Sequence, residues 1–443
     1  MTEVSRAQNS AFTSGLGPAP DLLHSYTPLP TPTSIRVIEW PKGLVATTDL
    51  RCSLRIIDLD DPDRPEFSAL SYTWGGWNGV EADDIDALDC LFTNSIICDG
   101  GLMRVTENCH RALSELRWRG RAHLFWVDAV CINQEDAEER NLQVAMMGRI
   151  YSSAIRTIIW LGERDKDADK ILELWNRCNS FGGLIPFTAP SLDDDNAESF
   201  LELDLRDSMI RETSSIMSFF SRPWFQRLWT IQEVVLAREI QIFCGTHTLE
   251  WSYLVSLARE TFPSPIRELD GEELTRRSLR GVSNIRTMAS LRGEMGMSTV
   301  ILSFPNRTES ERYTQTLMTL ITEFQDTLAS DSRDRIFAPV ALANQVHGRQ
   351  TTQEQLEPNY NDSIQTIFIK SALYMLRQSQ SLYILGFCRG WDGPLPSNIP
   401  TWVPDFRARL NQRPISSVSR SHATVHWQPF FRCEYLLVIS HLQ

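Results

Sequence analysis

The residues of this chain best suited to chemistry lie on a helix that we predict over residues 224–238. Trp229 and Glu233 are four positions apart and share one face of that helix, and Arg222 and Gln226 are expected on the same stripe. A carboxylate beneath an indole and near a guanidinium can stabilise the cationic, sugar-like transition state of glycosidic bond cleavage. The same spacing fits a structural role, in which the aromatic residues belong to the core and Glu233 pairs with an arginine.

A second group of polar residues follows a short apolar run at residues 124–127, which predicts a buried strand. Asp128 stands at the carboxyl end of that strand and Asn133 lies in the polar turn after it, at the edge where open α/β sheets bind ligands. Asp128 can orient a ribose hydroxyl or a positive partner, or it can cap the turn. Cys131 has no base beside it in the sequence, so we interpret it as a small buried residue, with a reactive thiol as the alternative.

Another predicted strand, at residues 69–74, carries aromatic residues at its end. Tyr72 and Trp74, followed by Gly75, can line a pocket or belong to the core. Residues 331–335 are dense in charge and predict a helix start, whose charges we assign to capping and to salt bridges between domains.

Composition narrows the classes of protein. An apolar content of 42% with 13 Trp supports a folded core, and a net charge of -13 argues against nucleic acid or an anionic membrane as the main partner. The 9 Cys form no C-x-x-C pair and the 8 His show no ligand spacing, so we expect reduced thiols in a cytoplasmic protein and no metal site. No apolar run reaches the roughly 18 residues of a membrane span, and no phosphate-loop, dinucleotide, zinc-protease or serine-hydrolase motif occurs.

The chain divides into three predicted parts. Residues 1–33 are rich in Ser, Pro and Gly and are interpreted as a flexible arm. Residues 34–255 are expected to form an α/β domain, because strands and helices alternate between 69 and 162. Residues 256–443 have mainly helical spacing and end in an irregular tail.

Six segments, in this order and spacing, resemble the HET domain of fungal heterokaryon-incompatibility proteins. They are ALSYTWG (69–75), LFWVDAVCINQEDAEERNLQVAMMGRIYSSA (124–154), IIWLGE (158–163), RPWFQRLWTIQEVVLA (222–237), DSRDRIFA (331–338) and IPTWVPDF (399–406). The resemblance covers residues 34–237 and extends more thinly to about 406. The sequence departs from the pattern of the family in two places. The acidic loop at 78–92 is longer than typical, and the chain ends soon after residue 406, which predicts a truncated tail.

The resemblance implies a role in fungal non-self recognition, an innate-immunity-like response in which activation causes programmed cell death. It also implies a TIR-like, flavodoxin-like fold: a mostly parallel sheet with flanking helices, followed here by a mainly helical region. Some TIR domains cleave NAD through a helical Glu that follows a Trp by four positions, as Glu233 follows Trp229. By this resemblance Glu233 is the catalytic candidate, and the pocket candidates are Tyr72, Trp74, Asp128, Arg222 and Trp229. Gly75 and Asn133 are added as pocket candidates because of their positions beside Trp74 and after Asp128.

Two functions remain open on this basis. One is an effector for which NAD is a substrate, with no bound cofactor and no metal. The other is a non-enzymatic adaptor that signals by self-association through the HET domain. In both, the expected partners are other incompatibility proteins.

Overall fold

The computed structural model describes residues 23–41, 49–75, 93–119, 124–180, 208, 211–261, 273–294, 308–348, 356–379, 382–388, 399–407 and 410. The acidic loop at 78–92, most of the predicted N-terminal arm and the C-terminal tail lie outside these residues.

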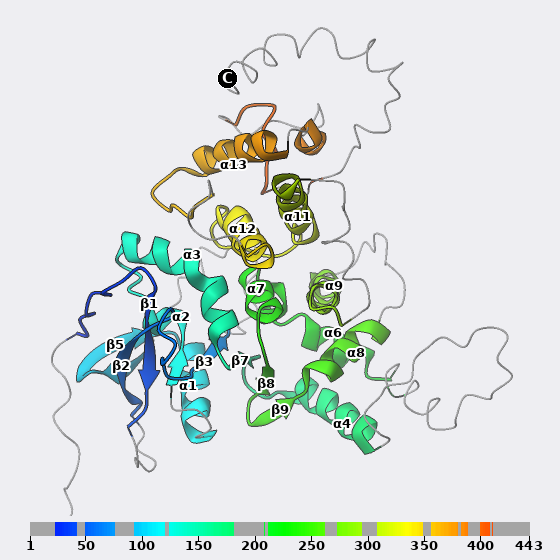
Figure 1. The fold of residues 1–443 in the computed structure, drawn as a ribbon. Coiled ribbons are helices and arrows are strands. Elements are labelled where there is room, and N and C mark those ends of the chain that lie inside the picture. Colours follow the sequence, from blue (N-terminus) through cyan, green and yellow to red (C-terminus); the bar gives the residue numbers. More distant parts are fainter. Residues whose placement is uncertain are drawn as a thin grey trace, which may run out of the picture.

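A nine-stranded mixed sheet forms the centre of the described α/β region (Figure 1). Its order is β5-β4-β2-β1-β6-β3-β7-β8-β9. The strands are β1 (Ser34–Glu39), β2 (Arg51–Asp58), β3 (Ser68–Ser71), β4 (Asn94–Cys98), β5 (Gly101–Val105), β6 (Leu124–Trp126), β7 (Arg156–Trp160), β8 (Ile240–Cys244) and β9 (His247–Leu249). The predicted α/β class is confirmed.

The sheet is less parallel than expected. The strands β6, β3, β7 and β8 run parallel, as β2 and β4 do, whereas β1 runs antiparallel to both of its neighbours. The hairpins β4–β5 and β8–β9 add antiparallel pairs at the two edges. Tight turns at Asp99-Gly100 and Gly245, all with positive φ, close these hairpins. The two hairpins and the antiparallel β1 together make the sheet mixed.

The parallel centre forms because its strands are short and apolar. Every residue of β3 and β6 is buried, as are the last four of β7, which is typical of strands covered on both faces. The strand predicted at residues 69–74 is shorter than expected. It corresponds to β3, which ends at Ser71 and leaves Tyr72 and Trp74 in the segment beyond the strand.

Helices pack around the sheet and extend into a separate helical layer (Figure 1). The α-helices are α1 (Glu107–Arg119), α2 (Asp128–Cys131), α3 (Ala137–Ser153), α4 (Lys166–Ser180), α6 (Thr213–Phe220), α7 (Trp229–Val235), α8 (Trp251–Thr261), α9 (Glu273–Leu291), α11 (Glu309–Glu323), α12 (Asp334–Val346) and α13 (Ile364–Ser379). Two 3-10 helices, η2 (Pro223–Gln226) and η3 (Leu382–Phe387), complete the described set.

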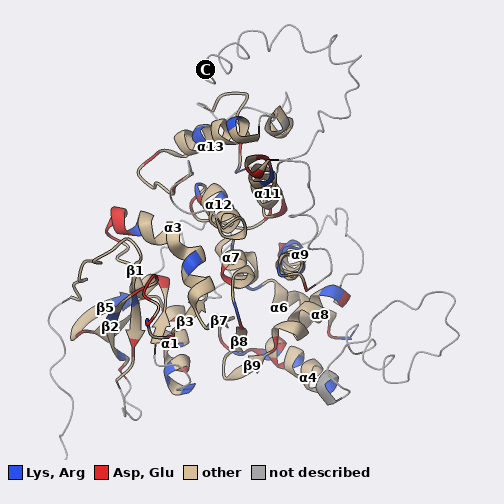
Figure 2. Ribbon diagram, in the orientation of Figure 1, with Lys and Arg blue, Asp and Glu red and all other residues tan. Residues whose placement is uncertain are grey.

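The polar turn after β6 ends in a capped helix. The Asp136 side chain accepts hydrogen bonds from the backbone of Glu138 and Glu139, at 3.0 and 3.1 Å, and so starts α3. Figure 2 shows acidic residues gathered at this start, where they favour the positive end of the helix dipole.

The helix predicted over 224–238 is broken. Arg227 is extended (φ -76, ψ 140) between η2 and α7. The chain there pairs with the segment before α12: Leu228 N donates to Leu328 O at 2.9 Å, and Leu328 N donates to Gln226 O at 2.7 Å. The expected stripe through Arg222, Gln226 and Trp229 therefore does not form.

Two apolar cores meet at α7. One lies around β1–β6 with α1, α2 and α3, and the other runs from β7 and β8 through α4, α6, α8 and α9 to α13. Trp229, Leu236 and Tyr360 pack against both. The boundary predicted at 255/256 falls inside α8, so packing is continuous across it.

The described chain is held against the sheet from Leu23 onward, before the predicted start at residue 34. Leu23 forms a bridge with Leu102 of β5, and His24 N donates to Leu102 O at 2.9 Å. Among the helices of the described part, none has both the length and the apolarity for a membrane crossing.

Candidate functional site

The carboxyl ends of β3 and β6 bring several predicted residues together. Trp74 Nε1 donates to Asp128 Oδ2 at 2.8 Å, and Ala129 N donates to Asp128 Oδ1 at 2.7 Å. Asp128 therefore starts the short helix α2 and also anchors an indole from the neighbouring segment. The contact between Trp74 and Asp128 arises because the parallel strands β3 and β6 end at the same edge of the sheet.

Glu233 lies beneath this edge on α7. It is 4% exposed, and its Oε2 atom is buried with no hydrogen-bond partner among the described residues. Its backbone carbonyl accepts from Thr157 Oγ1 of β7 at 3.2 Å, which fixes the helix against the sheet. A buried carboxylate oxygen without a partner is costly, and such groups are typical of functional sites.

The surroundings of Glu233 favour its neutral form. The pKa of Glu233 is raised to about 7, mainly by burial and also by the nearby Asp128 carboxylate, while Arg227 and the hydroxyls of Ser71 and Tyr151 oppose the rise. Ser71 Oγ accepts from Trp224 Nε1 at 2.9 Å, so its own hydrogen can be donated to Glu233. A carboxyl group with such a pKa can hold or release a proton near neutral pH.

Asp128 and Glu233 share one cation. Burial raises the pKa of Asp128, and Arg227 is the main opposing influence for both carboxyl groups. Arg227 also donates from Nη1 to Tyr72 O. Burial and the Asp128 charge raise the pKa of the Tyr72 hydroxyl, which is itself buried without a partner in the described part of the chain. The cluster therefore joins Tyr72, Asp128, Arg227 and Glu233.

Trp229 faces a different acid. Its Nε1 donates to Asp334 Oδ2 of α12 at 2.9 Å, and Tyr360 donates from its hydroxyl to Asp334 Oδ1 at 2.5 Å. Burial raises the pKa of Asp334 to about 6. The predicted helix start at 331–335 thus supplies the acid that fixes Trp229. The N-cap residue of α12, Arg333, makes no capping bond through its side chain, and its ion pair is with Asp331 in the same segment.

Two predicted pocket residues lie elsewhere. Arg222 reaches the carboxyl ends of β7 and β8, where its guanidinium donates to Leu161 O at 2.9 Å and to Asp165 Oδ2 at 2.7 Å. Asn133 donates from its backbone to Glu139 Oε1 at 2.7 Å in the turn before α3. The observed contacts of both are structural. Gly75 remains beside the cluster, and its carbonyl accepts from Thr73 Oγ1 at 3.0 Å.

Sequence reasoning missed three contributors, Arg227, Ser71 and Tyr151. Arg227 was hidden by the prediction of a continuous helix, on which it points away from Glu233. Tyr151 of α3 donates to Leu70 O at 3.0 Å and carried no role in the sequence interpretation. The thiol of Cys131 is fully buried, and burial raises its pKa, which fits the small buried residue interpreted from the sequence.

Comparisons with known proteins place this cluster within one family match. Residues 67–233 match the family model Heterokaryon incompatibility protein (HET), which spans β3 to Glu233. The chain is 24% identical over 418 residues to Heterokaryon incompatibility protein 6, OR allele, of Neurospora crassa, covering 85% of this chain and 58% of that protein.

A second relative is Vegetative incompatibility protein HET-E-1 of Podospora anserina, 22% identical over 187 residues, which are 42% of this chain and 10% of that protein. No solved structure matches the chain. The family match over residues 67–233 and the order of the motifs agree, so this part of the chain is similar to the HET region of incompatibility proteins.

Proposed function

We propose that this protein acts in fungal heterokaryon incompatibility as an effector of cell death that hydrolyses NAD. The HET-domain match and two relatives whose names state incompatibility support the biological role. The observation that carries the chemistry is Glu233, a buried carboxyl group with an unpartnered Oε2 and a pKa raised to about 7.

In the proposed reaction the bond between the nicotinamide nitrogen and ribose C1′ breaks, and its electron pair leaves with nicotinamide. Water adds to C1′ and loses a proton, so the products are nicotinamide, ADP-ribose and H⁺. The ionised Glu233 stabilises the positive charge that develops on the ribose. Arg227 favours this ionised form, and Asp128 disfavours it.

The residues around Glu233 supply the contacts that a nucleotide requires. Trp74 is partly buried at the end of the sheet and offers an aromatic face for the nicotinamide ring. Asp128, at the strand end, is suited to accept hydrogen bonds from ribose hydroxyls. Because Glu233 is 4% exposed, the substrate must displace part of the rim to reach it.

The same burial favours a second function, a non-enzymatic adaptor that self-associates through the HET domain. In that case Glu233 is a structural group between Ser71 and Tyr151, and its raised pKa is a consequence of burial alone.

The test is nicotinamide release from NAD by the purified full chain at high concentration. We expect Glu233→Gln to lower the rate by about 10²-fold or more, as loss of a transition-state charge does. Glu66→Gln, a change at an exposed position, is the matched control. Absence of release from folded wild-type protein, together with cell killing that survives Glu233→Gln, would establish the adaptor instead.

A further inference from the structure

Three side chains with metal-binding atoms meet where the first described residues cross the β4–β5 hairpin. A ring nitrogen of His24, Cys98 Sγ and a carboxylate oxygen of Asp99 all lie within 4.8 Å of one another. They come from segments 74 residues apart in sequence, as the hydrogen bond between His24 and Cys98 shows. This separation is why local spacing predicted no metal site.

The histidine is held as metal-binding histidines are. His24 Nδ1 lies 3.1 Å from the carbonyl oxygen of Cys98, and its Nε2 is buried without a partner among the described residues. In the tautomer that donates from Nδ1, Nε2 carries a free lone pair. Metal-binding histidines commonly orient their ring by such a bond from the second nitrogen to a carbonyl.

A second thiol stands beside the first. Cys52 of β2 is the register partner of Cys98 of β4, and both side chains are buried, at 7% and 0% exposure. The Cys98 thiol interacts most strongly with Cys52, and this contact and burial raise its pKa.

The carboxylate is held in place by the turn. Asp99 has φ 49, and its two carboxylate oxygens accept from Leu54 N at 3.2 and 3.3 Å. Cys98 Sγ lies 3.8 Å from Asp99 Oδ2. A surface cleft lined by Trp40, Cys52 and Gly100, among others, opens beside the group and gives an ion a route from solvent.

We propose that His24, Cys98 and Asp99, with Cys52 as fourth ligand, bind one zinc ion. Imidazole, thiolate and carboxylate are the ligands that zinc takes in tetrahedral sites, at about 2.0–2.3 Å. Ligand atoms within 4.8 Å of one another need only small side-chain movements to reach that geometry. Binding releases the two thiol protons to solvent, and two thiolates with one carboxylate give the zinc-loaded site a net charge of −1.

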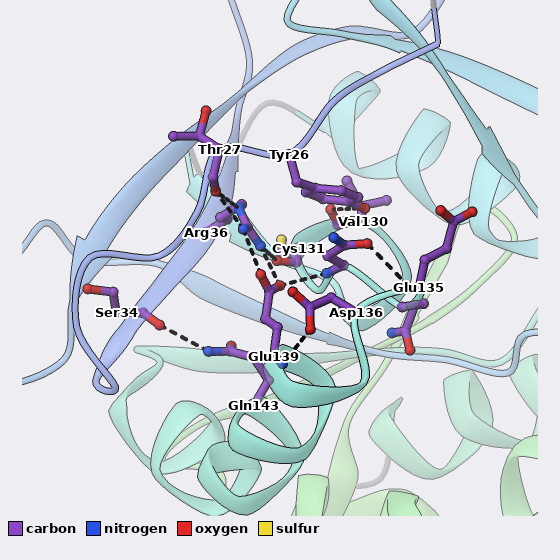
Figure 3. Close-up of polar contacts among 12 residues, drawn as sticks. Tyr26, Thr27, Ser34, Arg36, Val130, Cys131, Glu135, Asp136, Glu139 and Gln143 are labelled. Atoms are coloured by element: carbon purple, nitrogen blue, oxygen red, sulfur yellow. Dashed lines mark hydrogen bonds and ion pairs between the residues drawn. The ribbon is translucent and has the colours of Figure 1, made fainter. Parts of the chain in front are cut away.

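Zinc bound at His24 would also affect the turn after β6, because the residues that directly follow His24 cover that turn. Tyr26 donates from its hydroxyl to Val130 O at 3.1 Å, and Thr27 O accepts from Arg36 Nη2 at 2.6 Å (Figure 3). Arg36 in turn binds Cys131 O and Glu139. Zinc at His24 therefore fastens the segment that holds one wall of the candidate site.

The experiment uses the reduced full chain after chelator treatment. We expect one equivalent of zinc by calorimetry, a tetrahedral thiolate–cobalt absorption spectrum on substitution with Co²⁺, and slower hydrogen exchange at residues 23–33 when zinc is bound. His24→Ala and Cys98→Ser should each weaken zinc binding by about tenfold or more. Cys388→Ser, a change of the thiol that directly follows η3, is the matched control and should change nothing.

Asp99→Asn keeps the proposal testable if Cys98→Ser fails to fold. Asparagine tolerates the positive φ of this position and retains an oxygen for Leu54 N, yet it lacks the ligand charge. We expect weaker zinc binding with an unchanged circular dichroism spectrum. Two results of the zinc titration would overturn the proposal: a stoichiometry near zero, or binding that survives both His24→Ala and Asp99→Asn. It would also be overturned if protein isolated without reductant contained a Cys52–Cys98 disulfide that persists when zinc is added.

Discussion

The raised pKa of Glu233 predicts a specific dependence of stability on pH, which Glu233→Gln should remove. At pH values between the pKa of Glu233 in the unfolded state and its higher pKa in the folded state, the carboxyl group binds more protons in the folded protein. Stability therefore falls as pH rises through this window, and the penalty is complete above the folded pKa. Glutamine has a similar shape and does not titrate.

The size of the effect follows from the environment of the side chain. The pKa of Glu233 rises from 4.5 to about 7, and at about 1.4 kcal/mol per pH unit this difference corresponds to about 3 kcal/mol. No discount for solvent applies, because the side chain is only 4% exposed. Between pH 5 and pH 8 the wild type should lose about 2.5 kcal/mol relative to Glu233→Gln.

Urea unfolding followed by tryptophan fluorescence at several pH values measures this difference. Asp128 and Asp334 also have raised pKa values, so the informative quantity is wild type minus variant at each pH. Glu66→Gln should run parallel to the wild type, since this position is exposed. If Glu233→Gln also ran parallel within about 0.5 kcal/mol, Glu233 would be ionised and well solvated, and the reasoning on its environment would be refuted.

Three further predictions concern the packing that positions the site. Trp229→Phe should cost about 1–3 kcal/mol in unfolding experiments, because it leaves Oδ2 of the buried Asp334 without its indole donor while Tyr360 still binds Oδ1; an effect no larger than that of a surface substitution would show that this bond contributes little. Glu139→Gln should cost about 3–5 kcal/mol, because Arg36 is 1% exposed and loses its charge partner, whereas Glu138→Gln, exposed one position earlier, should cost far less. Gly281→Ala should lower the thermal midpoint strongly, because the new Cβ would lie 2.1 Å from Phe220 O; an unchanged midpoint would mean that α6 and α9 separate easily.

The parts of the fold that could be predicted are those encoded in short stretches. The apolar runs of β6 and β7 and the Asp136 cap of α3 are local signals of this kind, and β6 lies close to the position predicted for it. The meeting of Trp74 with Asp128 was also predictable, because parallel strands deliver their carboxyl ends to one edge.

What could not be predicted depends on partners far away in sequence. The break at Arg227 is stabilised by pairing with Leu328, about a hundred residues later, and no local pattern in residues 222–237 requires it. At that break Arg227 donates to the carbonyl of Tyr72. The His24 and Cys98 contact is hidden for the same reason.

The same long-range contacts show that the site belongs to more than the matched HET segment. Helix α9 supplies Asn284 Nδ2 to Phe225 O at 2.8 Å, and the carbonyl of Arg277 accepts from Gln226 Nε2 at 3.0 Å, so η2 is held in place by the helical region. Leu328 fixes the extended residue that follows. Because η2 and this break set the direction of Arg227, the charge balance around Glu233 depends on residues beyond the family match. The helical region is therefore a structural part of the candidate site, and changes in it can reach Glu233 without touching the HET segment.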